Sequence, residues 1–81
     1  MMPETLVLRD ELKTCLRQKL VDVASAMFLA RAVDVIEKAQ SSREALLDAA
    51  AKVGKMVSLF LDKELGKEIG DELVARIRKA T

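Results

Sequence analysis

The side chains that could carry chemistry are few in this chain of 81 residues. Cys15 is the one thiol, and the sequence holds no histidine that could activate it. A nucleophilic cysteine needs an adjacent base, and zinc sites combine several Cys and His ligands. We therefore predict a protein that is not an enzyme, with no catalytic residue, cofactor or metal. We interpret Cys15 as a partly buried helix residue.

Three carboxylates near the C-terminus are spaced for a shared helix face. Glu68, Asp71 and Glu72 stand at positions i, i+3 and i+4, a spacing that could hold a hard cation weakly. Metal sites in helical bundles usually add a Glu-x-x-His pair, which this sequence lacks. Acidic residues near a helix N-terminus also stabilise the helix dipole. A carboxylate metal-binding helical protein is therefore the weaker alternative.

Basic residues form two groups that could contact phosphates. Arg9, Lys13 and Arg17 recur at four-residue intervals, and a second basic cluster occupies positions 76–79. The chain as a whole has 14 basic and 13 acidic residues, a net charge of +1, and only 2% aromatic residues for base stacking. This balance argues against nucleic acid as a partner. A small nucleic-acid-binding regulator stays as the first alternative.

The composition predicts an all-α fold. Hydrophobic residues make up 51% of the chain and charged residues 33%, with only 3 Gly and 1 Pro, so strong helix formers dominate and turns are few. The length is that of one domain, which we place at 1–81. A core this small needs a supplement, and close helix packing or self-association can provide it.

A long first helical segment is predicted over Glu4–Ala39, and Pro3 suits a first helical turn. No Gly or Pro interrupts Thr5–Ala39, and two apolar stripes with helical spacing follow one another along it. The first stripe comprises Leu8, Leu12, Leu16, Leu20, Val23 and Met27, and the second comprises Leu29, Ala32, Val33, Ile36 and Ala39. The stripes lie on different faces. The helix therefore either breaks near Ser25 or stays whole and touches different neighbours along its length.

A second helix is predicted from Ser42 to about Leu65. Ser41 and Glu44 have the spacing of a capping box at its start, and Gly66 is placed to end it in the left-handed conformation. Its buried seam would comprise Leu46, Ala50, Val53, Val57 and Phe60. The remaining residues form a short third helix or a kinked continuation. Gly66 and Gly70 could instead mark a close helix contact. We predict a bundle of three helices, or four if the first breaks.

The passage "ASAMFLARA", Ala24–Ala32, is the most apolar part of the chain. It is shorter than the roughly 20 apolar residues of a membrane span, so we expect no membrane insertion. An unbroken first helix would be roughly 50 Å long against roughly 36 Å for the second, which leaves part of this passage uncovered. We assign a protein interface to Met27, Phe28, Leu29, Val33 and Ile36.

The function predicted from these patterns is a non-catalytic helical protein-interaction module that self-associates as a dimer. A further protein partner is compatible with the same surface. The N-terminus has neither the basic segment nor the long apolar run of a signal peptide, and a lone cysteine suits a reducing compartment. We therefore expect a cytoplasmic protein.

Overall fold

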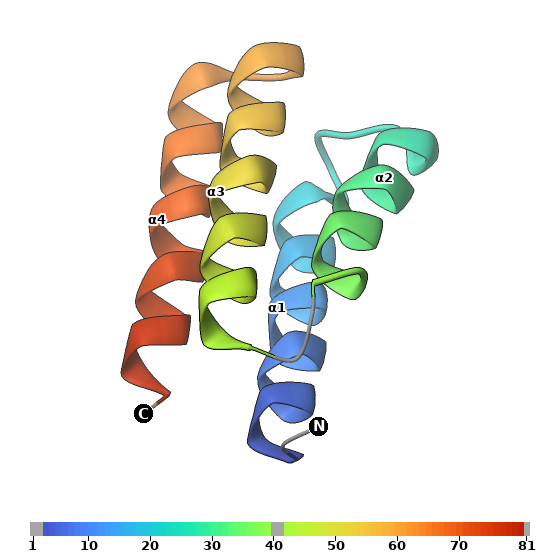
Figure 1. Cartoon of the computed structure of the whole chain (residues 1–81). Helices are drawn as coiled ribbons and strands as arrows, with labels where there is room; N and C mark the ends of the chain where they lie inside the picture. The colour runs from blue at the N-terminus through green and yellow to red at the C-terminus, as the bar shows by residue number, and fades with distance from the viewer. Residues whose placement is uncertain (1–2, 40–41, 81) are drawn as a thin grey trace.

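Four helices make up the regular structure of the chain. The computed structural model describes residues 3–39 and 42–80, with α1 at Pro3–Leu20, α2 at Ala26–Glu37, α3 at Arg43–Phe60 and α4 at Lys63–Lys79. Successive helices run antiparallel and pack side by side, and α1 also packs against α4, which closes an up-and-down four-helix bundle (Figure 1). The predicted all-α fold is confirmed. The predicted count of three helices is wrong, and the four-helix alternative is correct.

The first helical segment breaks just before Ser25. The carbonyl of Leu20 accepts hydrogen bonds from the amides of Val23 at 3.1 Å and Ala24 at 3.0 Å, which ends α1 in a turn. Ser25 then caps α2, because its extended backbone lets Oγ accept a hydrogen bond from the Phe28 amide at 3.2 Å. The break lets both apolar stripes face one core. It also removes the 50 Å helix, and with it the length argument for a second copy.

The start of α3 differs by one residue from the predicted capping box. Ser42 is the N-cap, and its Oγ accepts a hydrogen bond from the Ala45 amide at 3.1 Å. Assigning the cap to Ser41 with Glu44 is therefore wrong, and Ser41 itself lies outside the described residues. Glu44 keeps a favourable place in the first turn, where a carboxylate stabilises the helix dipole.

The end of α3 is the largest departure from the sequence prediction. α3 ends at Phe60 rather than Leu65, and a two-residue connection leads into α4. Asp62 caps α4 by accepting a hydrogen bond from the Leu65 amide at 2.7 Å. Gly66 lies in the first turn of α4, and no described glycine has a positive φ, so Gly66 is not a C-cap. α4, the helix predicted to be short, is long because the Asp62 cap starts it at Lys63.

Three glycines bring α3 and α4 into backbone contact. A Cβ placed on Gly54 would lie 3.0 Å from the Gly70 Cα and 3.1 Å from the Gly66 oxygen. A Cβ on Gly66 would overlap the backbone nitrogen and Oγ of Ser58 and lie 2.6 Å from the Gly54 oxygen. The close helix contact suggested by Gly66 and Gly70 is therefore correct, with Gly54 as its partner on α3.

The core lies between the two helical hairpins and is built from aliphatic side chains. The first four positions of the α1 stripe and of the α3 seam are buried, as predicted. Their partners on the other helices are Ala32 and Ile36 of α2 and Ile69, Leu73 and Ile77 of α4. None of the buried side chains among the described residues is polar or charged. The bundle is therefore held together by apolar packing, and its polar groups lie on the surface.

The glycine contact predicts unequal effects of alanine at three positions. Gly66→Ala should lower the free energy of unfolding by roughly 3 kcal/mol or more, because the Ser58 and Gly54 backbone atoms, as well as the Ser58 hydroxyl, block the new methyl group. Gly70→Ala should be within about 1 kcal/mol of wild type, since its Cβ would meet the Gly54 Cα at an acceptable 3.4 Å and alanine favours the helix. Gly54→Ala should fall between them. Urea denaturation of the three variants measures this order, and equal stability of all three would contradict it.

Candidate interaction surface

Large apolar side chains are exposed mainly at one end of the bundle. Both the α1–α2 connection and the α3–α4 connection lie at this end, as Figure 1 shows. We define the open end by the six exposed apolar residues in or next to these connections, namely Val21, Val23, Met27, Leu59, Phe60 and Leu61. Among the described residues one other large apolar side chain is comparably exposed, Val7, which lies toward the opposite end of α1.

Two residues of the open end are continuations of buried seams. Val23 follows Leu20 on the α1 stripe, and Phe60 follows Val57 on the α3 seam. Leu20 and Val57 are fully buried, whereas Val23 is 51% exposed and Phe60 is 71% exposed. The same sequence pattern that builds the core therefore extends past the region that the chain covers.

The register between α2 and α3 explains why Phe60 is uncovered. Val35 of α2 and Ala49 of α3 line the same groove between these antiparallel helices. Phe60 follows Ala49 by about three helical turns, so it lies on the same α2-facing side of α3. It is roughly 16 Å further along the helix. α2 begins at Ala26, only roughly 13 Å from Val35. The α3–α4 hairpin therefore overhangs the α1–α2 hairpin, and Figure 1 shows this overhang.

The exposed apolar area at the open end is large for a chain of this size. With roughly 150–200 Å² for each fully exposed side chain, the six residues together expose roughly 600 Å². The largest apolar patch on an ordinary monomer is about 300–600 Å² and is often functional. Exposed large apolar side chains among the described residues are thus concentrated at the open end.

The residues predicted as an interface on α2 do not stay together. Met27 is 70% exposed and belongs to the open end. Leu29 and Val33 are half-buried and lie in a shallow groove of about 420 Å³ between α1 and α2. Phe28 is half-buried against the core, and Ile36 is fully buried inside it, so Ile36 offers no surface to a partner.

Sequence reasoning missed the α3 contribution to this surface. The heptad-like spacing predicts Phe60 as the last buried residue of a helix that continues to about Leu65. The signal that could have corrected this is Asp62, an N-cap residue followed by Glu64 in the first turn of α4. A helix that starts at 63 must end its predecessor before 62, which leaves Phe60 at a helix terminus.

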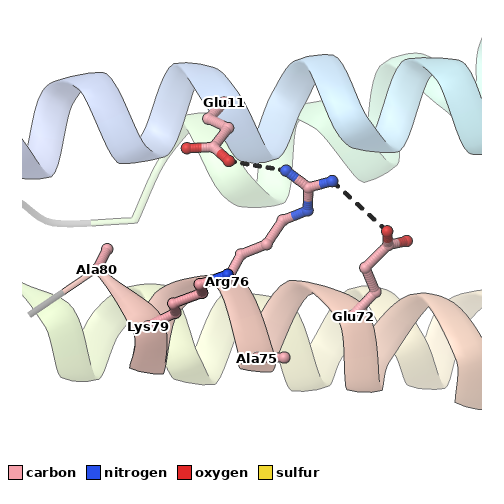
Figure 2. Close-up of a pocket in the computed structure, with 6 residues that line it drawn as sticks. All are labelled: Glu11, Glu72, Ala75, Arg76, Lys79 and Ala80. Atoms are coloured by element: carbon pink, nitrogen blue, oxygen red, sulfur yellow. Dashed lines mark hydrogen bonds and ion pairs between the residues drawn. The ribbon is translucent and has the colours of Figure 1, made fainter.

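A polar cleft of about 520 Å³ lies between α1 and α4. Figure 2 shows Arg76 extending from α4 between two carboxylates, Glu11 of α1 and Glu72 of α4. Its guanidinium lies 2.7 Å from Glu11 Oε1 and 3.5 Å from Glu72 Oε1. Lys19 adds an ion pair at 3.3 Å to the other oxygen of Glu72. The cleft is thus a charge network that connects the helices.

The ionisation of this network favours charged carboxylates. Partial burial acts to raise the pKa of Glu72, but Lys19 and Arg76 outweigh it and leave that pKa below its ordinary value. On the α1–α2 side, the hydrogen bond from Lys13 lowers the pKa of Glu37. Burial raises the pKa of the Cys15 thiol, and the charge of Glu72 raises it further, so the thiol stays protonated and unreactive.

The candidate basic faces are largely paired with carboxylates or carbonyl groups. Lys13 forms ion pairs with Asp10 and Glu37, and Arg9 donates a hydrogen bond to the Glu37 carbonyl at 3.3 Å. Arg17 is exposed at the edge of the α1–α2 groove. In the C-terminal cluster, Arg76 is held by the polar cleft. No continuous basic face of the kind that tracks a phosphate backbone results from these positions.

Two of the three acidic residues considered for a metal pair with a lysine instead. Glu68 and Glu72 both lie near Lys19, at 3.5 Å and 3.3 Å from its Nζ, while Asp71 is exposed. Across residues 3–39 and 42–80, no group of three or more His, Cys, Asp or Glu side chains is arranged to hold a metal ion.

None of the helices in the described part of the chain is both long enough and apolar enough to cross a membrane. Comparison of the chain with protein-family models, with curated proteins and with solved structures finds no match.

The paired carboxylates predict how stability depends on pH. Glu37 and Glu72 have folded-state pKa values below the ordinary 4.5, so their contribution is present above that pH and is lost as the pH falls through the lowered values. The free energy of unfolding should be nearly constant from about pH 7 to 5 and decline below about pH 4.5. Urea denaturation across this range tests it. Glu72→Gln should flatten the decline, whereas Asp48→Asn, at an exposed position of α3, should keep it.

Proposed function

We propose that this chain is a non-catalytic helical module that self-associates through its open end. The observation that carries the proposal is the exposure of Val23 and Phe60, which continue the two main core seams beyond the cover that the chain provides. A second copy can supply that cover, since it brings the same apolar residues to the interface. We place the module in the cytoplasm, where the single free thiol of Cys15 stays reduced.

Area and charge both favour a second copy as the partner. A standard interface buries about 800 Å² on each side, and the apolar residues of the open end supply roughly three-quarters of it before any flanking residue is counted. The net charge of +1 gives two copies little reason to repel one another. Symmetric homodimers, in which the same patch is used twice, are the commonest oligomers.

The polar side chains support binding rather than catalysis. The one thiol is buried with a raised pKa, and the carboxylates of the polar cleft are engaged with Arg76 and Lys19. The α1–α2 and α1–α4 surfaces therefore present compensated charges, while the open end presents apolar side chains. We propose no nucleic-acid-binding or metal-binding role, since most of the residues considered for them pair with other residues of the chain, namely Arg9, Lys13, Arg76, Glu68 and Glu72.

Self-association can be tested with Phe60→Ser. The wild type should sediment at twice its 8.9 kDa chain mass at micromolar concentration. Phe60→Ser should weaken the dimer by about 30-fold or more, the effect of losing a residue that carries about 2 kcal/mol of binding energy. Analytical ultracentrifugation over a concentration series gives both dissociation constants. A wild type that stays at 8.9 kDa at all concentrations would refute the proposal.

Val7→Ser is the matched control. Val7 is 67% exposed, close to the 71% of Phe60, but lies outside the open end. It should leave the dissociation constant unchanged. Both variants should change the stability of the monomer by no more than about 0.5 kcal/mol, because both side chains are already exposed in the single chain. Loss of the dimer in Phe60→Ser therefore cannot be attributed to unfolding.

A further inference from the structure

The open end has the shape of a step. The α3–α4 hairpin projects past the α1–α2 connection, as Figure 1 shows, so one half of this end is higher than the other. Phe60 lies on the α2-facing side of the projecting α3, above the level at which α2 begins. Val21 and Val23 lie in the connection below it. The apolar surface is therefore carried partly on the side of the projecting hairpin and partly on the lower connection.

We infer that two copies interlock by these steps about a two-fold axis perpendicular to the helices, with the α3–α4 hairpin of each copy lying over the α1–α2 connection of the other. This inference rests on the proposed function and adds the arrangement of the partner. In this arrangement the two α3 ends run antiparallel beside each other. The α2-facing sides of the two projecting α3 helices then face each other across the axis. Phe60 therefore lies next to the axis and meets Phe60 of the second copy.

Shape decides between this arrangement and the other way of joining two identical ends. If hairpin met hairpin, the projecting tips would abut, and the lower connections with Val21 and Val23 would stay apart and exposed. In the interlocked arrangement each projection fills the space above the partner's connection, so both parts of the apolar surface are buried at once. Because the same patch is used twice, the assembly closes as a dimer and leaves no copy of the patch for a third chain.

The inferred dimer also completes the core pattern of each chain. Below the step, the α2-facing side of α3 packs against α2 through Ala49 and its neighbours. Above the step, α2 is absent, and the partner's α3 takes its place against Phe60. The seam of α3 is then covered over its whole length, partly by its own chain and partly by the second copy.

Disulfide mapping tests this arrangement in a Cys15→Ala background, which removes the natural thiol. Chains carrying only Val23→Cys are mixed with chains carrying only Leu61→Cys, so that every disulfide is intermolecular and Phe60 stays in place. The interlocked dimer predicts that the mixed disulfide forms about 10²-fold faster than a disulfide between Val7→Cys chains, because thiols held together react at millimolar effective concentration. Disulfides between two Leu61→Cys chains should form more slowly than the mixed one.

The outcomes separate this inference from the proposed function. Preferential mixed disulfides in a protein that sediments as a dimer support the interlocked arrangement. A dimer in which Leu61→Cys chains pair with themselves, or in which no pair exceeds the Val7→Cys rate, would overturn the arrangement and leave self-association standing. A wild type that sediments as a monomer would overturn both.

Discussion

The contact between Gly54 on α3 and Gly66 and Gly70 on α4 determines much of the architecture. Because no side chain separates the two backbones there, α3 and α4 lie unusually close along a straight hairpin that a two-residue turn closes. Of the two helices beside this hairpin only α2 is shorter, with 12 residues against 18 in α3 and 17 in α4. The hairpin projects past the α1–α2 connection at the open end, as Figure 1 shows.

The break before Ser25 is the second determinant of the open end. A straight helix over the whole first segment would have presented Leu8 and Leu20 to one side and Ile36 to another. Breaking it lets α2 fold back so that all three side chains reach the same core. The five residues of this turn, 21–25, lie outside any helix. Because α2 begins only at Ala26, it does not reach the level of Phe60. Burial of the core and exposure of the open end are thus two effects of one reversal.

Periodicity predicted the core well and the helix ends poorly. The α1 stripe and the α3 seam were correct wherever a neighbouring helix exists, because helical spacing alone fixes which side chains share a face. It says nothing about where that neighbour ends, so Val23 and Phe60 were assigned by pattern and are exposed in the structure. Gly66 was misassigned for a related reason. A glycine near a turn fits a C-cap as well as a close contact, and only Asp62, four residues earlier, distinguishes the two.

The residues predicted as an interface on α2 also show that an apolar pattern does not identify the neighbour that covers each residue. An apolar passage such as "ASAMFLARA" can face a core, a groove or solvent, and the sequence cannot divide it among them before the antiparallel partners are known. The structure assigns Ala32 to the core, Leu29 to the α1–α2 groove and Met27 to the open end.

The distribution of charge then favours the end of the bundle over its sides for association. Along the sides, Lys13 pairs with Glu37 between α1 and α2, and Arg76 pairs with Glu11 between α1 and α4. Covering such exposed pairs would cost desolvation energy and return little, because each is already compensated in water. At the open end, where Asp22 and Asp62 are also exposed, a partner would displace water from Val, Leu, Met and Phe side chains, whose burial is favourable at about 25 cal/mol per Å². Both effects act in the same direction, so the proposed second copy would gain most free energy where the seams of the core continue into solvent.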